Sequence, residues 1–231
     1  MALNVDTTGQ GSGSNVDVLY WTHTATPGVA GYIIFAVSWQ DLSLDGITIT
    51  EMDHGENALS FICEYSTSAG YLSIWGGTPG SSFNQASVNW DGPGAYATAI
   101  SISFTGVFQE NPIGTAVHSS GTGTTMSRSI TGVSTDNLFV DFLGMYRVGA
   151  DETPSPNSSQ TFRASISLHI VGTTYQRDSC STRPGIDTTI TMQWTTAFTW
   201  IWQQVAIELH ATPTKATELA LLGVGTKPAA T

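Results

Sequence analysis

Histidine, serine and aspartate side chains could support hydrolysis, but this sequence does not arrange them in a known catalytic pattern. The chain has no nucleophile elbow, no zinc-protease motif and no phosphate-binding loop. Two G-x-G pairs, within 121–125 and 223–225, lack the rest of a nucleotide-binding fingerprint. The histidines are scattered, at His23, His54, His118, His169 and His210. We therefore expect a protein that is not an enzyme and that needs no cofactor.

Three carboxylates gather around one polar turn. Glu51, Asp53 and Glu56 could hold a calcium ion, because calcium prefers hard oxygen ligands. A solvated polar turn explains the same spacing without a metal, and we favour that interpretation.

Two tryptophans stand two residues apart near the C-terminal end of the chain. Trp200 and Trp202 alternate with Ile201 in a strand-like pattern and lie opposite Val205 and Ile207. If they face outward, the indoles form an apolar strip about 7 Å long at the rise of a strand. A sugar or a partner protein could stack on this strip, or a loop or the C-terminal segment could cover it.

Two further features concern covalent chemistry. Asn157 begins an N-x-S acceptor sequence for N-glycosylation, in a loop rich in proline and serine. Cys63 and Cys180 are the two cysteines, too few for a disulfide scaffold and without metal-site spacing. They could form one disulfide, but we expect two separate thiols.

The elements that must position these residues are strands. The stretch Val29–Trp39, VAGYIIFAVSW, is uncharged and apolar on both alternating faces, which predicts a central strand covered on both sides. Alternating segments recur between turn signals along the chain and predict about twelve strands with little or no helix. We expect an all-β fold, an antiparallel two-sheet sandwich of jelly-roll type.

Composition divides the chain into three parts. Residues 1–14 are rich in glycine and serine, which predicts a flexible N-terminal arm, and 15–211 form the sandwich. Residues 212–231 form a linker and an apolar segment, which contains Leu219, Leu221, Leu222 and Val224. Such a short apolar segment outside a completed domain must find cover on its own sandwich or on another copy.

Charge and hydropathy exclude several partners. The formal net charge is −11 with only 7 Lys and Arg, so no basic patch exists to bind nucleic acid or an anionic membrane surface. No apolar run reaches the roughly 18 residues that a membrane-spanning helix needs.

The N-terminal residues do not have the pattern of a signal peptide. The Ser/Thr/Gly-rich composition is typical of secreted or virion-surface proteins, and we expect an extracellular or virion location.

The order of motifs resembles β-sandwich domains of phage structural proteins and secreted bacterial proteins. Four segments carry the resemblance: Trp21–Gly28, Gly70–Gly80, Ala99–Thr115 and Ser181–Leu209. The resemblance covers roughly residues 10–210 and implies a concanavalin-like or galactose-binding-like sandwich. It implies no catalytic residues, and the segment 211–231 is extra to it.

Two functions follow as hypotheses. The first is a non-enzymatic structural subunit that assembles with copies of itself into a filament or virion structure. In this hypothesis Leu219, Leu221, Leu222 and Val224 add as a strand to a neighbouring copy. The alternative is a carbohydrate-binding module that uses Trp200 and Trp202.

Overall fold

The computed structural model describes residues 2–26, 31–41, 47–68, 70–80, 85–92, 94–132 and 134–213. Within these residues the fold is all-β and antiparallel, with fifteen strands and no helix. The strands form three sheets rather than the two that were predicted. The count exceeds the expected dozen partly because β5 (Asn57–Ala58) and β12 (Ser155–Pro156) are two-residue strands that carry no periodic signal.

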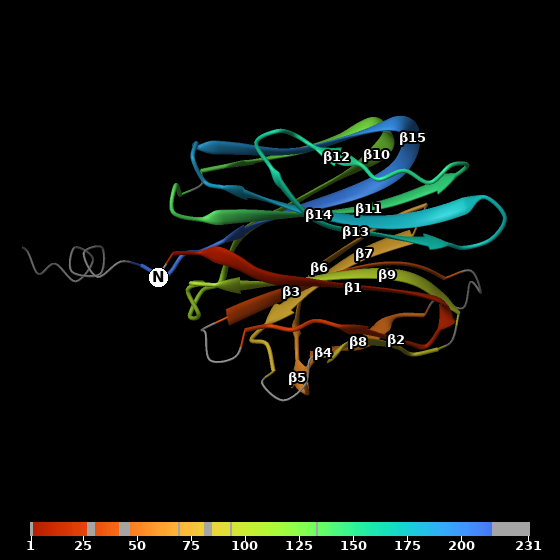
Figure 1. Cartoon of the computed structure of the whole chain (residues 1–231), viewed down its shortest axis with the longest axis horizontal. Coiled ribbons are helices and arrows are strands. Elements are labelled where there is room, and N and C mark those ends of the chain that lie inside the picture. Colours follow the sequence, from red (N-terminus) through yellow and green to blue (C-terminus); the bar gives the residue numbers. More distant parts are fainter. Residues whose placement is uncertain are drawn as a thin grey trace, which may run out of the picture.

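The three sheets are stacked, and Figure 1 shows them edge-on. The central sheet has the order β1 (Asn4–Val16), β9 (Ala95–Thr105), β3 (Gly31–Asp41), β7 (Gly70–Gly77), β6 (Ser60–Thr67). The lower sheet has the order β2 (Val18–Thr22), β8 (Gln85–Trp90), β4 (Ile49–His54), β5. The upper sheet has the order β10 (Ile113–Thr131), β15 (Thr189–Leu209), β11 (Leu138–Val148), β14 (Thr174–Pro184), β13 (Thr161–His169), with β12 paired to β15.

β3 is the middle strand of the central sheet, as its apolar pattern predicts. Ile33, Phe35 and Val37 pack with the lower sheet, whereas Ile34 and Ala36 pack with the upper sheet. All five side chains are buried. A strand with a core on each side has no face for polar residues, which is why VAGYIIFAVSW carries no charge.

The N-terminal residues correct one prediction. Residues 4–16 form β1, which pairs with β9 along its length, and are therefore not a flexible arm. Two glycines explain the misleading composition. A Cβ at Gly9 would lie 2.6 Å from the carbonyl oxygen of Thr22, and a Cβ at Gly11 would lie 2.7 Å from Trp21 Cβ. Glycine is required here because β1 passes very close to β2, not because the chain is loose.

The upper sheet folds over itself. β10 and β15 pair with each other along most of their length, but the register shifts between Gly123 and Thr125, opposite residues 196–199 of β15. Beyond this bend their far halves cover the outer face of β11, and the curved strands appear at the top of Figure 1. The packing creates two further apolar clusters, whose buried members are Met126, Leu143, Met145, Trp194, Trp200 and Trp202 in one, and Ile130, Phe139, Ile190, Met192 and Ala206 in the other.

Candidate functional site

Trp200 and Trp202 do not form an exposed aromatic strip. Trp200 is 1% exposed and Trp202 is 8% exposed, and both pack against Met126, Leu143 and Met145 under the folded-over halves of β10 and β15. The prediction of an outward strip is therefore wrong. The cover is neither a loop nor the C-terminal segment but the bent part of β10 and β15 itself, which packs over the second face of β15.

The nearest approach to a catalytic arrangement surrounds His23, between the lower and central sheets. His23 Nδ1 lies 2.8 Å from Ser101 Oγ of β9, and His23 Nε2 lies 3.2 Å from Thr7 Oγ1 of β1. Trp21 Nε1 donates to the same Ser101 Oγ at 2.9 Å. A serine beside a histidine could be a nucleophile beside its base. Ser101 is completely buried, however, so no substrate can reach its hydroxyl.

The hydrogen bonds are consistent with two neutral histidines in this cluster. Burial, together with the charge of neighbouring His54, lowers the pKa of His23 to about 4, although Asp6 acts in the opposite direction. The backbone N–H of Gly80 donates to His54 Nδ1 at 3.1 Å, so His54 Nε2 carries the proton and donates to the carbonyl oxygen of His23 at 3.0 Å. These polar contacts connect β1, β4 and β9 and stabilise the packing of the lower sheet on the central sheet.

The acidic turn does not assemble a metal site. Glu51 and Glu56 are exposed, and Asn89 Nδ2 donates to Glu51 Oε2 at 3.1 Å. Burial, and then the charge of Glu51, raise the pKa of Asp53. In the part of the chain that the structure describes, no three His, Cys, Asp or Glu side chains are grouped closely enough to hold a metal ion.

The candidates for covalent modification are Asn157 and the two cysteines. Asn157 is exposed, and its Nδ2 donates to Gln193 Oε1 at 3.2 Å. Cys63 and Cys180 are free thiols, so the structure contains no disulfide between them. Both pack into the core between the central and upper sheets, where burial raises the pKa of Cys63 to about 11 and that of Cys180 well above its usual value. Neither is suited to nucleophilic chemistry.

The predicted assembly residues Leu219, Leu221, Leu222 and Val224 lie outside the described residues. The structure shows where the chain leaves the sandwich. Ala211 bridges to Val107, and the backbone N–H of Thr212 donates to the carbonyl oxygen of Gly106 at 2.9 Å. This end of the molecule also holds the N-terminus, which is marked in Figure 1. The sequence beyond Thr212 therefore starts at one pole of the domain.

β6 is the candidate surface for an added strand. It forms one edge of the central sheet and, in the described part of the chain, pairs only with β7. Its sequence SFICEYST contains no proline or lysine, and Glu64 is its one charged residue. Natural sheets usually protect such an edge with charges or proline. A register irregularity between Phe61 and Cys63 leaves Cys63–Thr67 as the regular part of the edge.

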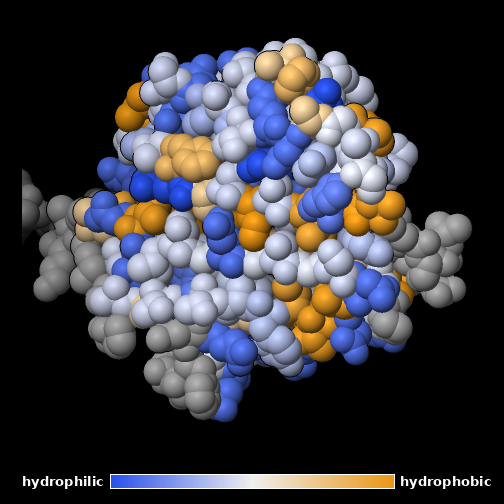
Figure 2. All heavy atoms as spheres, turned by 45° about the vertical axis from the view of Figure 1, so that its right-hand side comes forward, coloured by the Kyte–Doolittle hydropathy of each residue, from blue (hydrophilic) through white to orange (hydrophobic). Residues whose placement is uncertain are grey.

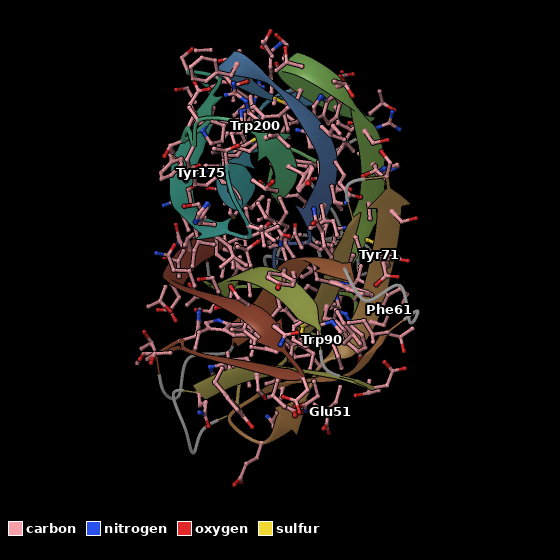
Figure 3. All side chains as sticks on the ribbon, turned by 90° about the vertical axis from the view of Figure 1, so that its right-hand side faces the viewer. Glu51, Phe61, Tyr71, Trp90, Tyr175 and Trp200 are labelled. Carbon is pink, nitrogen blue, oxygen red and sulfur yellow. The ribbon has the colours of Figure 1, made fainter. Side chains whose placement is uncertain are left out.

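Phe61 is the exposed apolar residue of this edge. It is 56% exposed, and its ring meets the ring of Trp75 edge-on at a centroid distance of 5.4 Å. Figure 3 shows Phe61 at the margin of the sheet, on the side away from β1. The sequence pattern gave no sign of this exposure, because edge position depends on how the strands are ordered in space. We call the unpaired side of β6, including the exposed Phe61 side chain, the β6 edge.

Comparisons with protein-family models, with curated proteins and with solved structures find no match for this chain. Among the described residues, no helix is long and apolar enough to cross a membrane.

Proposed function

We propose that this protein is a non-enzymatic structural subunit, a sandwich of jelly-roll type that assembles with copies of itself in an extracellular filament or a virion. In this proposal the apolar segment Leu219–Val224 of one copy pairs with the β6 edge of the next. It is consistent with the resemblance to phage structural and secreted proteins. The observation that carries the proposal is the β6 edge, which in the described part of the chain pairs only with β7 and carries a single charge.

Strand addition suits this surface better than side-chain packing alone. Figure 2 shows apolar side chains in several separate patches on the face that it draws, not in one continuous area. Main-chain hydrogen bonds along Cys63–Thr67 would supply the pairing, while Phe61 offers a local apolar contact. Burying the four apolar side chains of the C-terminal segment would contribute on the order of 5 kcal/mol before ordering costs.

The positions of the two parts favour a chain of subunits. The C-terminal sequence starts at the pole beside Gly106, whereas β6 lies along the side of the central sheet. Donor and acceptor are different surfaces, so the contact is head-to-tail and propagates unless the rotation closes a ring. The net charge of −11 further favours partners other than nucleic acid.

Truncation tests the proposal. The full chain and a chain ending at residue 213 would be compared by negative-stain electron microscopy and light scattering. The shortened chain keeps β15 and the contacts of Thr212, so it should fold as a monomer, whereas the full chain should form filaments or closed assemblies. Assemblies that survive truncation unchanged would refute the role of the segment.

A charge on the edge tests the acceptor surface separately. Phe61→Lys places a lysine on the β6 edge and should abolish assembly while leaving the fold intact. Phe198→Lys is the matched control, because Phe198 is a comparably exposed phenylalanine on a different strand. Equal loss of assembly in both variants would show that the effect is general charge repulsion.

A further inference from the structure

A polar hollow lies at the start of the β6 edge. It has a volume of about 440 Å³ and is open to solvent. Gly76 and Gly77, at the end of β7, line it without side chains. The polar residues around these two glycines come from β3, the β4–β5 hairpin, β6, the residue after β7 and the loop between β9 and β10, and they are Tyr32, Glu56, Asn57, Ser60, Thr78 and Gln109.

Two hydroxyl residues of the hollow share one face of the central sheet. Gly76 pairs with Ser60 on one side and with Ile34 on the other, and Ile34 packs toward the upper sheet. Paired residues point to the same face of a sheet, so Ser60 is also on the face turned to the upper sheet. A Cβ at Gly76 would lie 2.8 Å from Tyr32 Oη. The hydroxyl of Tyr32 therefore lies over Gly76, on the face that Ser60 shares.

The Tyr32 hydroxyl is unpaired within the part of the chain that the structure describes. Tyr32 is 9% exposed, and no described residue forms a hydrogen bond with its hydroxyl. Burial raises the pKa of Tyr32. Buried tyrosine hydroxyls usually have a hydrogen-bond partner. The unpaired hydroxyl therefore indicates that a polar group of a ligand belongs in the hollow.

The two amides of the hollow add further acceptors. Asn57 Nδ2 donates to the carbonyl oxygen of Thr78 at 3.4 Å, and Gln109 Nε2 donates to the carbonyl oxygen of Val107 at 3.1 Å. Their amide nitrogens are thus engaged within the protein, and their oxygens remain to accept hydrogen bonds beside the Tyr32 hydroxyl. A hollow that is rich in acceptors matches a ligand group that donates.

The hollow is also negatively charged. Glu56 is the charged residue of its lining, and among the described residues that line it there is no lysine, arginine or histidine. Glu56 has a φ of 69°, in the left-handed region that residues other than glycine seldom adopt. An anionic ligand would be repelled here, and a neutral hydroxyl would leave the carboxylate without a counter-charge. An ammonium group has three donors, no acceptor and a positive charge, and it fits this set best.

The sequence indicates where such an ammonium group comes from. The chain has two lysines, Lys215 and Lys227, and both belong to the C-terminal residues 212–231, which contain no arginine. The same residues hold the apolar segment that is proposed to add to the β6 edge. A negatively charged hollow at one end of this edge is therefore matched by the positive charges that flank the apolar segment.

The direction of the added strand selects one of the two lysines. Every strand pair of the central sheet is antiparallel, and antiparallel pairing is slightly the more stable. In an antiparallel pair with Val224 opposite Cys63, the chain continues toward the start of β6. Lys227 stands three residues after Val224, and Ser60 stands three residues before Cys63. Lys227 then lies beside Ser60, at the hollow.

We propose that this hollow binds the ammonium group of Lys227 from a neighbouring copy, with the carboxylate of Glu56 as its counter-charge. The inference rests on the proposed function, because it needs the C-terminal segment of one copy on the β6 edge of the next. It adds two things to that function. The added strand runs antiparallel to β6, and a charge pair at its end fixes the register, which the apolar segment alone specifies weakly.

Exchange of the two charges tests the proposal on the full chain. Glu56→Lys and Lys227→Glu each place like charges at the contact, so each variant alone should need at least about fivefold more protein to assemble at low salt. A one-to-one mixture should assemble near the concentration of the unmodified chain, because the segment of each variant then meets the opposite charge on the other. Light scattering over a dilution series measures these concentrations, and negative-stain electron microscopy identifies the assemblies.

Two further variants keep the test decisive. Lys215→Glu is the matched control, because it makes the same change of charge in the same segment, and its mixture with Glu56→Lys should not assemble near the unmodified concentration. Glu56→Gln removes the charge without reversing it and should raise the concentration needed about twofold or more. It serves if circular dichroism shows that Glu56→Lys does not fold.

Three results would overturn the proposal. They are single variants that assemble as the unmodified chain does, a mixture no better than either variant alone, and equal recovery with Lys215→Glu. Any of these, together with loss of assembly on truncation at residue 213, would leave the proposed function standing. An unmodified chain that does not assemble would overturn both, so the two failures are distinguishable.

Discussion

At the scale of single residues, hydrogen bonds between buried polar groups join neighbouring sheets. His23 is hydrogen-bonded to Ser101 and to Thr7 between the lower and central sheets. Asp178 of the upper sheet accepts hydrogen bonds from the hydroxyl and backbone N–H of Ser38 in the central sheet. Buried networks of this kind stabilise one arrangement of the sheets, because a shifted arrangement would leave several groups unpaired. They are consistent with a structural role.

Ser101→Ala tests whether the hydrogen bonds around His23 stabilise the fold. The substitution leaves Trp21 Nε1 and His23 Nδ1 without their common partner, which should lower the free energy of unfolding by about 1–3 kcal/mol. Urea denaturation would measure the change. Ser129→Ala, at an exposed serine of β10, should change it by less than about 0.5 kcal/mol. Equal effects of the two substitutions on the free energy of unfolding would contradict a stabilising role for the hydrogen bonds around His23.

Two enclosed carboxyls predict the dependence of stability on pH. Burial raises the pKa of Asp141 and of Asp178 to about 7, although hydrogen bonds from Trp194, Gln204 and Ser38 act in the opposite direction. The unfolded chain loses these protons near the usual value of 3.8, whereas the folded chain retains them. Stability should therefore fall as pH rises from about 4 to about 7, by up to about 1.4 kcal/mol per pH unit for each group.

His23 changes stability with pH in the opposite direction to the two carboxyls, which provides a control. Its pKa is lowered to about 4, so in the range between about 4 and its usual 6.5 the unfolded chain binds the proton and stability rises with pH. Two carboxyls outweigh one histidine in the unmodified protein. The double variant Asp141→Asn/Asp178→Asn should reverse the slope in urea titrations at successive pH values. If stability still fell with rising pH in the double variant, the raised pKa values of Asp141 and Asp178 would not be the cause.

At the scale of elements, the strands with strong apolar periodicity follow from the sequence and the others do not. Val29–Trp39 predicts the central β3. The alternation of Ile186, Ile190, Met192 and Trp194 predicts one buried face; the last three are buried in β15, whereas Ile186 lies before this strand and is 64% exposed. The bend in β10 and β15 is not visible in the pattern, because periodicity reports which residues are buried but not what covers them. The burial of Trp200 and Trp202 was missed for this reason.

β1 shows how composition can mislead. Glycine and serine are common both in flexible linkers and where two strands pass closely, and composition alone does not separate these cases. Gly11→Val should destabilise the fold by about 1–3 kcal/mol, because its side chain would overlap Trp21. The neighbouring substitution Ser12→Val, at an exposed position of the same strand, is the control. If residues 4–16 were a loose arm, thermal denaturation would show no difference between the two.

At the scale of the whole molecule, the described residues form three stacked sheets and place β6 at one edge of the central sheet. The candidate surfaces were only partly foreseen. The apolar C-terminal segment is evident in the sequence, whereas the β6 edge and the exposure of Phe61 depend on strand order and register. Those are tertiary properties that a single sequence does not state.

Intermolecular cross-linking would show whether the C-terminal segment of one copy reaches the β6 edge of another. Ser66→Cys places an exposed thiol on β6, and Leu221→Cys places one in the C-terminal segment. When the two variants are mixed under mild oxidation, we expect a disulfide-linked dimer that contains one chain of each. Ser12→Cys, exposed on β1 at the opposite edge of the central sheet, should not cross-link with Leu221→Cys. Equal cross-linking at both edges, or none at β6, would contradict the account.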